Sequence, residues 1–185
     1  MEEIQVGAGR VRVVQGDIVT AGTEAIVNAA NAALAGGGGV DGAIHRAAGP
    51  ELLEMTRPYG GCPIGGAVIT GAGRIPPPTR FIIHAVGPRY SEARATECRS
   101  LLRSAHEASL HLAEKNAVQS VAFPAISTGV YGYPIADAAP VALGAAIEHL
   151  ATGTRSLELI VFVLFTEANL QVFAKALLAS PHARA

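Results

Sequence analysis

The residues best suited to chemistry in this sequence lie in one glycine-rich stretch, residues 28–46. It carries several reactive or ligand-binding groups: the amides of Asn28 and Asn31, four consecutive glycines at 36–39, the carboxylate of Asp41 and the imidazole of His45. Consecutive glycines are costly in backbone entropy, so they indicate exposed N–H groups and close approach to a ligand. A helix pattern begins here, and its dipole favours an anion. The stretch predicts a phosphate-bearing ligand, with Asn31 and Asp41 facing its polar end.

The glycines Gly37, Gly39 and Gly42 formally match the G-x-G-x-x-G fingerprint of dinucleotide-binding enzymes. That fingerprint needs its first glycine directly after a strand, and an acid about twenty residues further on at the end of the next strand. Here about eight residues separate the strand pattern from Gly37. The downstream acids Glu51 and Glu54 lie in a helical pattern. A nicotinamide-dependent dehydrogenase is therefore the less favoured interpretation.

A second glycine-containing loop, residues 124–134, follows the apolar strand pattern of residues 121–123 and precedes a helical pattern. In open α/β sheets, ligands bind outside the carboxyl ends of the strands. Taken alone, this loop is typical of an ordinary strand-to-helix turn. Taken together with the first loop, it predicts a pair of loops that hold a diphosphate from opposite sides.

Several polar side chains have a structural interpretation beside the functional one. Asp17, after the first long strand pattern, is either a helix N-cap or an acceptor for an exocyclic amine such as that of adenine. Asp41 and His45 are four residues apart at a helix start, hence on one face. Asp41 either caps that helix or orients a water near bound phosphates, whereas a lone His45 is typical of a surface or core histidine.

The sequence shows no metal-ligand spacing and no Walker A or Gly-x-Ser-x-Gly motif, so we expect no metal and no cofactor.

The composition limits the class of protein. With 185 residues, 50% of them hydrophobic, the chain is expected to form a single domain over residues 1–185. The net charge of −1 and the scattered basic residues do not favour a nucleic-acid partner. The apolar run at 159–165 is far shorter than the roughly twenty residues that span a bilayer, and the start does not resemble a signal peptide. We therefore expect a cytoplasmic protein without a membrane partner, and no disulfide framework from Cys62 and Cys98.

Strand and helix patterns alternate along the chain. Strands are predicted at residues 10–14, 25–28, 67–70, 81–86, 120–123 and 157–165. Helices are predicted at residues 41–56, 93–115, 137–150 and 167–178, with Pro140 in the first turn of the third. This alternation predicts an α/β sheet covered by helices on both faces.

Three motifs together resemble the macrodomain family, in particular its MacroD-type hydrolase branch. They are Val27-Asn-Ala-Ala-Asn31, Gly38-Gly39-Val40-Asp41-Gly42 and Ile126-Ser-Thr-Gly-Val-Tyr-Gly132-Tyr-Pro134. Further fragments in the same order, Gly16-Asp17-Ile18 and Ile83-His84-Ala85-Val86-Gly87-Pro88 among them, extend the resemblance over almost the whole chain. The resemblance implies a three-layer α/β/α macrodomain with a mixed, mostly parallel central sheet. It also implies an ADP-ribose cleft at the strand ends.

The resemblance implies roles for individual residues. Asp17 and the backbone N–H of Ile18 would hold the adenine end, with Phe165 against the ring. Asn31 would bind the distal ribose, and Asp41 would position or activate the hydrolytic water. The implied ligand-binding set is Asp17, Ile18, Asn31, Gly38, Gly39, Val40, Asp41, Ser127, Thr128, Gly129, Val130, Tyr131 and Phe165. The implied catalytic set is Asn31, Asp41 and His45.

The implied reaction is hydrolysis of an ester at the distal ribose of ADP-ribose. It would remove mono-ADP-ribose from acidic side chains of proteins and deacetylate O-acetyl-ADP-ribose. The implied partners are ADP-ribose, its derivatives and ADP-ribosylated proteins, with nucleic acid only as an ADP-ribosylated substrate. Two alternatives stay open: a non-catalytic ADP-ribose reader, against which Asn31 and Asp41 argue, and an ADP-ribose-1''-phosphate phosphatase. The activator of the water, Asp41 or a substrate phosphate, also stays open.

Overall fold

The computed structural model describes residues 1–184, which form a seven-stranded sheet in the order β1-β2-β7-β6-β3-β5-β4. The strands are β1 (Glu2–Val6), β2 (Gly9–Gln15), β3 (Ala25–Ala29), β4 (Ala67–Gly71), β5 (Phe81–Ala85), β6 (Ser120–Phe123) and β7 (Leu159–Leu164). The pairs β1–β2 and β4–β5 are antiparallel, and the inner strands are parallel. The predicted mixed, mostly parallel sheet is confirmed.

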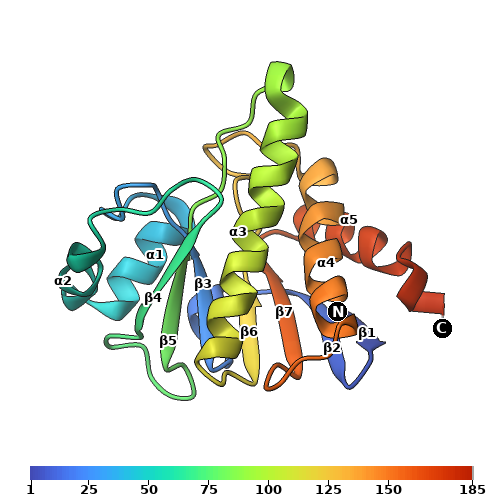
Figure 1. The fold of residues 1–185 in the computed structure, drawn as a ribbon, viewed down its shortest axis with the longest axis horizontal. Coiled ribbons are helices and arrows are strands. Elements are labelled where there is room, and N and C mark those ends of the chain that lie inside the picture. Colours follow the sequence, from blue (N-terminus) through green and yellow to red (C-terminus); the bar gives the residue numbers. More distant parts are fainter. Residues whose placement is uncertain (185) are drawn as a thin grey trace.

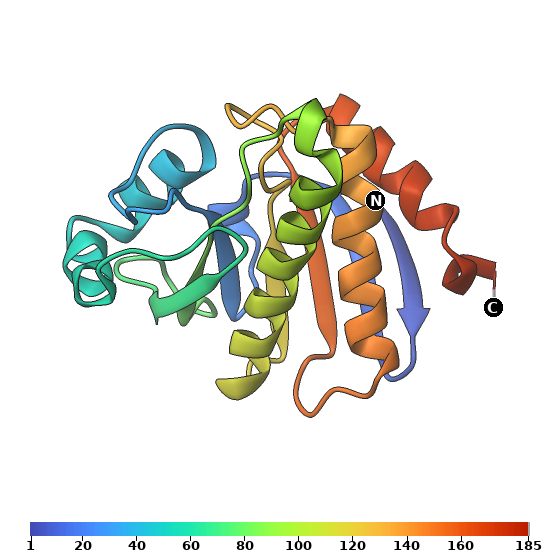
Figure 2. The same cartoon turned by 45° about the horizontal axis from the view of Figure 1, so that its top comes forward.

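Helices cover both faces of the sheet (Figure 1, Figure 2). The helices α1 (Gly39–Ala48) and α2 (Glu51–Thr56) lie on one face, and α3 (Ala95–Lys115), α4 (Ile135–Ala151) and α5 (Glu167–Leu178) lie on the other. Short 3-10 helices add η1 (Ile18–Thr20), η2 (Arg57–Tyr59), η3 (Glu92–Arg94) and η4 (Pro181–Arg184). The three-layer α/β/α fold is therefore confirmed. Within residues 1–184, no helix is long and apolar enough to cross a membrane.

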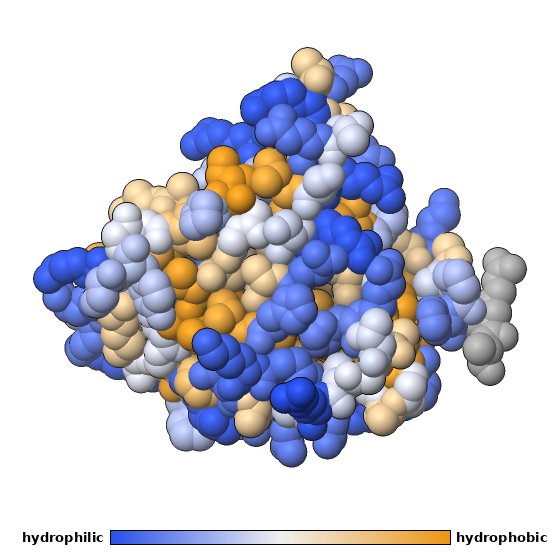
Figure 3. Space-filling view, viewed as in Figure 1, coloured by the Kyte–Doolittle hydropathy of each residue, from blue (hydrophilic) through white to orange (hydrophobic). Residues whose placement is uncertain are grey.

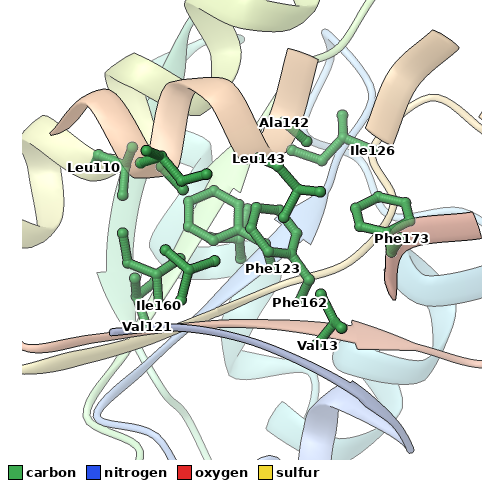
Figure 4. Close-up of a cluster of buried hydrophobic side chains, with 14 of the residues drawn as sticks. Val13, Leu110, Val121, Phe123, Ile126, Ala142, Leu143, Ile160, Phe162 and Phe173 are labelled. Carbon is green, nitrogen blue, oxygen red and sulfur yellow. The ribbon is translucent and has the colours of Figure 1, made fainter. Parts of the chain in front are cut away.

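The side-chain alternation of the strands gives each face its own core. On the α3–α5 side the rings of Phe123 and Phe162 stack at 5.6 Å, and that of Phe173 lies 5.5 Å from Phe162 (Figure 4). On the α1/α2 side a smaller aliphatic cluster forms, in which Ile26 of β3 packs with Ile44 of α1. On the outside, hydrophilic and hydrophobic residues are interspersed over the face that carries α3 and α4 (Figure 3).

Three predictions about elements were wrong. β1 was missed, because this edge strand has only the short alternation of Ile4 and Val6 as its signal. The predicted helix over 41–56 begins earlier, at Gly39, and is interrupted at Gly49, whose φ of 86° is left-handed. The helix predicted from 137 begins at Ile135, which places Pro140 beyond its first turn. Pro140 is exposed, and so is Ala136, the residue whose carbonyl loses its N–H partner in the helix.

Candidate functional site

A cavity of about 370 Å³ opens at the carboxyl ends of the parallel strands, where β3 and β6 lie side by side. The chain leaves β3 toward α1 on one face of the sheet and leaves β6 toward α4 on the other. Loops that diverge in this way open a crevice, which is the usual ligand site of open α/β sheets. The sheet topology therefore creates this cavity, and the two glycine-containing loops are its walls.

The cavity brings most of the predicted site together. One wall contains Asn31, Gly38, Gly39, Val40 and Asp41, and the other contains Ser127, Gly129, Val130 and Tyr131. The predicted residues outside the lining are Asp17, Ile18, His45, Thr128 and Phe165. Thr128 donates its hydroxyl to the carbonyl of Ala125 at 2.9 Å, which directs it back into its own loop. His45 lies behind Asp41 rather than in the wall.

Asp17 and Phe165 lie outside the cavity lining, further along the same edge of the sheet. They follow the neighbouring strands β2 and β7, which the N–H of Gly16 joins at their ends by donating to the carbonyl of Leu164 at 2.9 Å. Asp17 Oδ1 accepts the N–H of Val19 at 3.0 Å, so the N-cap interpretation of this residue is correct. Its carboxylate is exposed, and the Phe165 ring is 77% exposed. Both groups are thus free to contact a ligand that reaches beyond the cavity.

The first loop presents the N-terminus of α1 to the cavity. Gly38 is the N-cap without a side-chain hydrogen bond, and Gly39 has a φ of 57°. A helix leaves its first N–H groups without partners in the helix, so this end attracts an anion. A Cβ on Gly42 would lie 2.6 Å from the carbonyl oxygen of Gly37, so this close approach requires glycine. The cap interpretation of Asp41 is wrong, because Gly38 holds that position.

Asp41 is buried, with 6% of its surface exposed, and its two carboxylate oxygens differ. Oδ1 accepts a hydrogen bond from Asn28 Nδ2 at 2.7 Å and lies 3.3 Å from His45 Nε2. Oδ2 lies beside Gly37, 3.2 Å from where a Cβ on that residue would stand. One oxygen is therefore anchored, while the other is beside the cavity wall. The predicted shared face of Asp41 and His45 is confirmed.

Asn31 both shapes the first loop and lines the cavity. Its Nδ2 donates to the carbonyl of Gly36 at 2.8 Å, and its Oδ1 accepts the N–H of Ala35 at 3.3 Å. These two bonds close the turn that leads into the glycines. An amide nitrogen has two hydrogens, so one donor of Asn31 remains for a ligand.

The second loop contains an unusual serine. Ser127 has a φ of 67°, rare for a residue with a side chain, and strain of this kind clusters at ligand sites. Its buried hydroxyl has no hydrogen-bond partner among residues 1–184. Gly87 lies against it, where a Cβ would collide with Ser127 Oγ. The hydroxyl therefore lies buried against Gly87 without a partner in the described part of the protein, while Ser127 as a residue lines the cavity.

The cavity also contains residues that the sequence did not single out as a site, notably Gly87 and Arg89 beyond β5. The guanidinium of Arg89 lies 4.7 Å from the centroid of the Tyr131 ring, a cation–π distance. The sequence signal for Gly87 and Arg89 was their position directly after the apolar strand β5. Only the strand order shows that β5 lies beside β3, and hence that these residues reach the cavity. Among the described residues, no group of His, Cys, Asp or Glu side chains could hold a metal ion.

Comparison with known proteins decides the family. Residues 27–142 match the family model described as Macro domain. The chain belongs to this family. The macrodomain is 51% identical over 172 residues to a Citrobacter rodentium protein named O-acetyl-ADP-ribose deacetylase, covering 91% of this chain and 95% of that protein. It is 45% identical to O-acetyl-ADP-ribose deacetylase 1 of Pantoea vagans, covering 91% and 98%.

Solved macrodomains share the fold. The Oceanobacillus iheyensis macrodomain with ADP is 40% identical, with a TM-score of 0.87 over 95% of this chain and 94% of that one. A Trypanosoma brucei macrodomain in complex with ADP-ribose is 37% identical, with a TM-score of 0.82 over 89% of this chain and 68% of that one. The predicted membership of the macrodomain family is confirmed.

Proposed function

We propose that this macrodomain binds ADP-ribose and hydrolyses an ester at its distal ribose, releasing acetate and ADP-ribose from O-acetyl-ADP-ribose. Relatives that match nine-tenths of the chain are named for this deacetylation, and related structures hold ADP or ADP-ribose. The observation that carries the proposal is the anchored carboxylate of Asp41 in the same cavity as the free N-terminus of α1. Removal of mono-ADP-ribose from acidic side chains is the second proposed reaction, because it cleaves an ester at the same ribose.

The layout of the sheet edge supports an extended ligand. Passing from β2 through β7 and β6 to β3 crosses strands about 4.8 Å apart, so the Asp17 and Asn31 ends are separated by about 14 Å. The N-terminus of α1 and the loop around Ser127 lie between or beside these ends and offer backbone N–H groups to phosphates. We assign adenine to Asp17 and Phe165, the diphosphate to the two loops, and the distal ribose to Asn31.

Asp41 Oδ2 is the proposed acceptor for the proton of the attacking water. A positioned general base contributes about 10²–10⁴ in rate. The remaining N–H of Asn31 would hold a ribose hydroxyl, which fixes the ester relative to that water. His45 Nε2 would support Asp41 from behind, as a positioning residue rather than a catalytic one.

The test compares the wild type with Asp41→Asn. Asparagine keeps an acceptor for Asn28 but replaces the free oxygen by NH2, which accepts no proton. We expect turnover of O-acetyl-ADP-ribose at saturating substrate to fall about 10²–10⁴-fold, with ADP-ribose binding retained in calorimetry. Wild-type turnover in the variant would remove Asp41 from the mechanism.

Parallel assays of the wild type separate the alternative functions. The substrates are O-acetyl-ADP-ribose, a protein carrying Glu-linked mono-ADP-ribose, and ADP-ribose-1''-phosphate. We expect turnover of the two esters. Tight ADP-ribose binding without turnover of any substrate would favour a non-catalytic reader, and phosphate release alone would favour a phosphatase.

A further inference from the structure

A row of buried polar side chains crosses the sheet beneath α1 and ends at Asp41. We call it the polar seam: Thr70 of β4, His84 of β5, Asn28 of β3 and Asp41 of α1. His84 Nε2 lies 3.0 Å from Thr70 Oγ1, and its Nδ1 lies 3.2 Å from Asn28 Nδ2. Asn28 Nδ2 continues the row to Asp41 Oδ1 at 2.7 Å. All four residues are buried, Asn28 completely.

Strand register brings the polar seam together. Asn28 is paired with His84 in the parallel β3–β5 ladder, and β4 lies on the other side of β5. Two residues earlier on the same face, Ile26 and Ile82 belong to the aliphatic core under α1 and α2. Buried polar groups lose their hydration, so even when they are hydrogen-bonded they add little net stability. Their presence here therefore needs a reason other than stability.

The hydrogen bonds of the polar seam have only one consistent assignment of donors and acceptors. Because the Asn28 amide nitrogen only donates, His84 Nδ1 must accept, which places the His84 proton on Nε2. Nε2 then donates to Thr70 Oγ1, and the Thr70 hydroxyl donates to the carbonyl of Gly71 at 3.0 Å. Burial, followed by the charge of nearby His45, lowers the pKa of His84 to about 4, so the ring is neutral at pH 7 as this assignment requires.

Asn28 is used as a double donor. Its two amide hydrogens serve His84 and Asp41, while its Oδ1 is buried without a partner in the described part of the chain. Rotating the Asn28 amide by half a turn would bring its oxygen within hydrogen-bonding distance of His84 Nδ1. The same rotation would place that oxygen against the carboxylate of Asp41. The fold thus leaves an acceptor unsatisfied in order to direct both donors, and unsatisfied buried groups in native proteins call for a specific explanation.

We propose that Asn28 and His84 are positioning residues for Asp41. His84 holds the Asn28 amide, and Asn28 holds Oδ1 of Asp41, so that Oδ2 stays at the cavity. Asp41 is the third residue of α1, from which an acidic side chain readily turns back to the free N–H groups at the helix start. Such a turn would remove the carboxylate from the water and occupy the N–H groups proposed to bind phosphate. This inference rests on the proposed role of Asp41 and deepens it.

Two substitutions at position 84 separate positioning from simple packing. His84→Asn places an amide oxygen near the Nδ1 position, so it keeps the acceptor for Asn28 and loses the bond to Thr70. His84→Gln places an amide nitrogen near the Nε2 position, so it keeps the bond to Thr70 and loses the acceptor. We expect kcat for O-acetyl-ADP-ribose to fall about 10–100-fold in His84→Gln, because a small misplacement of a catalytic group has effects of this size. We expect kcat within about twofold of wild type in His84→Asn, with KM unchanged in both variants.

A direct readout covers the case in which a variant does not fold. Long-range proton–nitrogen NMR of the wild type at pH 7 reports which His84 nitrogen carries the proton. We expect Nε2–H with a bare Nδ1, whereas a protonated Nδ1 would overturn the proposal.

His106 is the matched control, since it is equally buried but lies between Phe123 and Phe162 on the other side of the sheet. His106→Gln should lower stability and leave kcat unchanged.

The outcomes distinguish this inference from the proposed function. If Asp41→Asn abolishes turnover while both His84 variants match the wild type in kcat, the positioning role is overturned and the catalytic role of Asp41 stands. An equal loss of kcat in His84→Asn and His84→Gln would also overturn it, because a general packing defect would then account for both. If Asp41→Asn turns over like the wild type, the mechanism itself fails, whatever the His84 variants do.

Discussion

The two sides of the sheet differ in how they are built. On the α3–α5 side, large aromatic and aliphatic residues such as Phe123, Phe162 and Phe173 fill a continuous apolar core (Figure 4). On the α1/α2 side, the apolar cluster is smaller and the polar seam crosses it. Each side contributes one loop to the cavity, since β3 leads to α1 and β6 leads to α4.

The two sides of the macrodomain therefore have different tasks. Buried polar groups add little to stability even when they are hydrogen-bonded, so the side with the polar seam depends on its neighbour to keep the sheet folded. The apolar side can supply that stability because close-packed aromatic side chains bury much surface. We therefore expect substitutions on the α3–α5 side to change stability, and substitutions in the polar seam to change turnover.

The largest expected effect is on the apolar side. Phe162→Ala removes a fully buried ring between Phe123 and Phe173, so the free energy of unfolding should fall by about 3–5 kcal/mol. Denaturant titration measures this loss. The fraction that stays folded should turn over substrate at the wild-type kcat. A large fall in kcat of folded Phe162→Ala would contradict the division between the two sides.

Each side also contains one buried histidine that resists protonation, which predicts a pH dependence. Burial lowers the pKa of His84 and of His106 to about 4, against about 6.5 in the unfolded chain. As the pH falls, the unfolded chain therefore binds a proton on each histidine before the folded protein does. The free energy of unfolding is highest above pH 6.5 and decreases as the pH falls toward 4. For each histidine, the free energy of unfolding should fall by about 3 kcal/mol between pH 6.5 and pH 4.

Removing one of these histidines tests the pH dependence. The unfolding free energy of the wild type, measured between pH 7 and pH 4, should fall more steeply than that of His106→Leu. The difference in slope should approach about 1.4 kcal/mol per pH unit, the value for one proton. His84→Asn is the matched variant on the opposite side and should flatten the curve to a similar extent. Identical slopes in all three proteins would show that neither histidine titrates as proposed.

The sequence was sufficient for the parallel strands and for the two loops. Short apolar runs at residues 25–27 and 121–123 mark β3 and β6, and the predicted range 120–123 coincides with β6 (Ser120–Phe123). The glycines of each loop lie within four consecutive residues, 36–39 and 129–132, so each loop is visible without coordinates. The interruption of the first helix at Gly49 was missed, because the apolar spacing of Ile44 and Leu52 continues across it.

The polar seam was beyond the reach of the sequence. His84 stands in an apolar strand and Asn28 is the last polar residue before the first loop, and nothing local connects them. Their contact depends on the order β3-β5-β4, which is set by long-range packing. Arg89 was overlooked for the same reason. Residue types predicted which groups do chemistry, but only strand order shows which other groups hold them.

The loop from the apolar side, residues 124–134, has a proposed role in ligand binding. Gly129→Glu directs a carboxylate toward the proposed diphosphate position, and juxtaposed like charges oppose binding by several kcal/mol. We expect ADP-ribose affinity in calorimetry to fall at least about a hundredfold. A Cβ at this position meets no atom within 4 Å, so the variant should fold. Gly129→Ala is the control and should bind normally; tight binding by Gly129→Glu would show that this loop does not hold phosphate.

The smallest expected effect is at Asp17, a proposed binding residue outside the cavity lining. Asp17 leads into η1, whose Ile18 packs in the cluster on the α1/α2 side, yet its proposed role is to hold the adenine amine. Asp17→Asn keeps an oxygen for the N–H of Val19 and replaces the other by NH2, which repels an amine. Stability should therefore be unchanged, while affinity should fall about tenfold, as expected for a lost charge-assisted hydrogen bond. Calorimetry with ADP-ribose and with ribose-5-phosphate separates the two halves of the ligand, since only the adenine-containing ligand should respond to the substitution. Equal affinities of wild type and Asp17→Asn for ADP-ribose would leave the adenine end without its proposed acceptor.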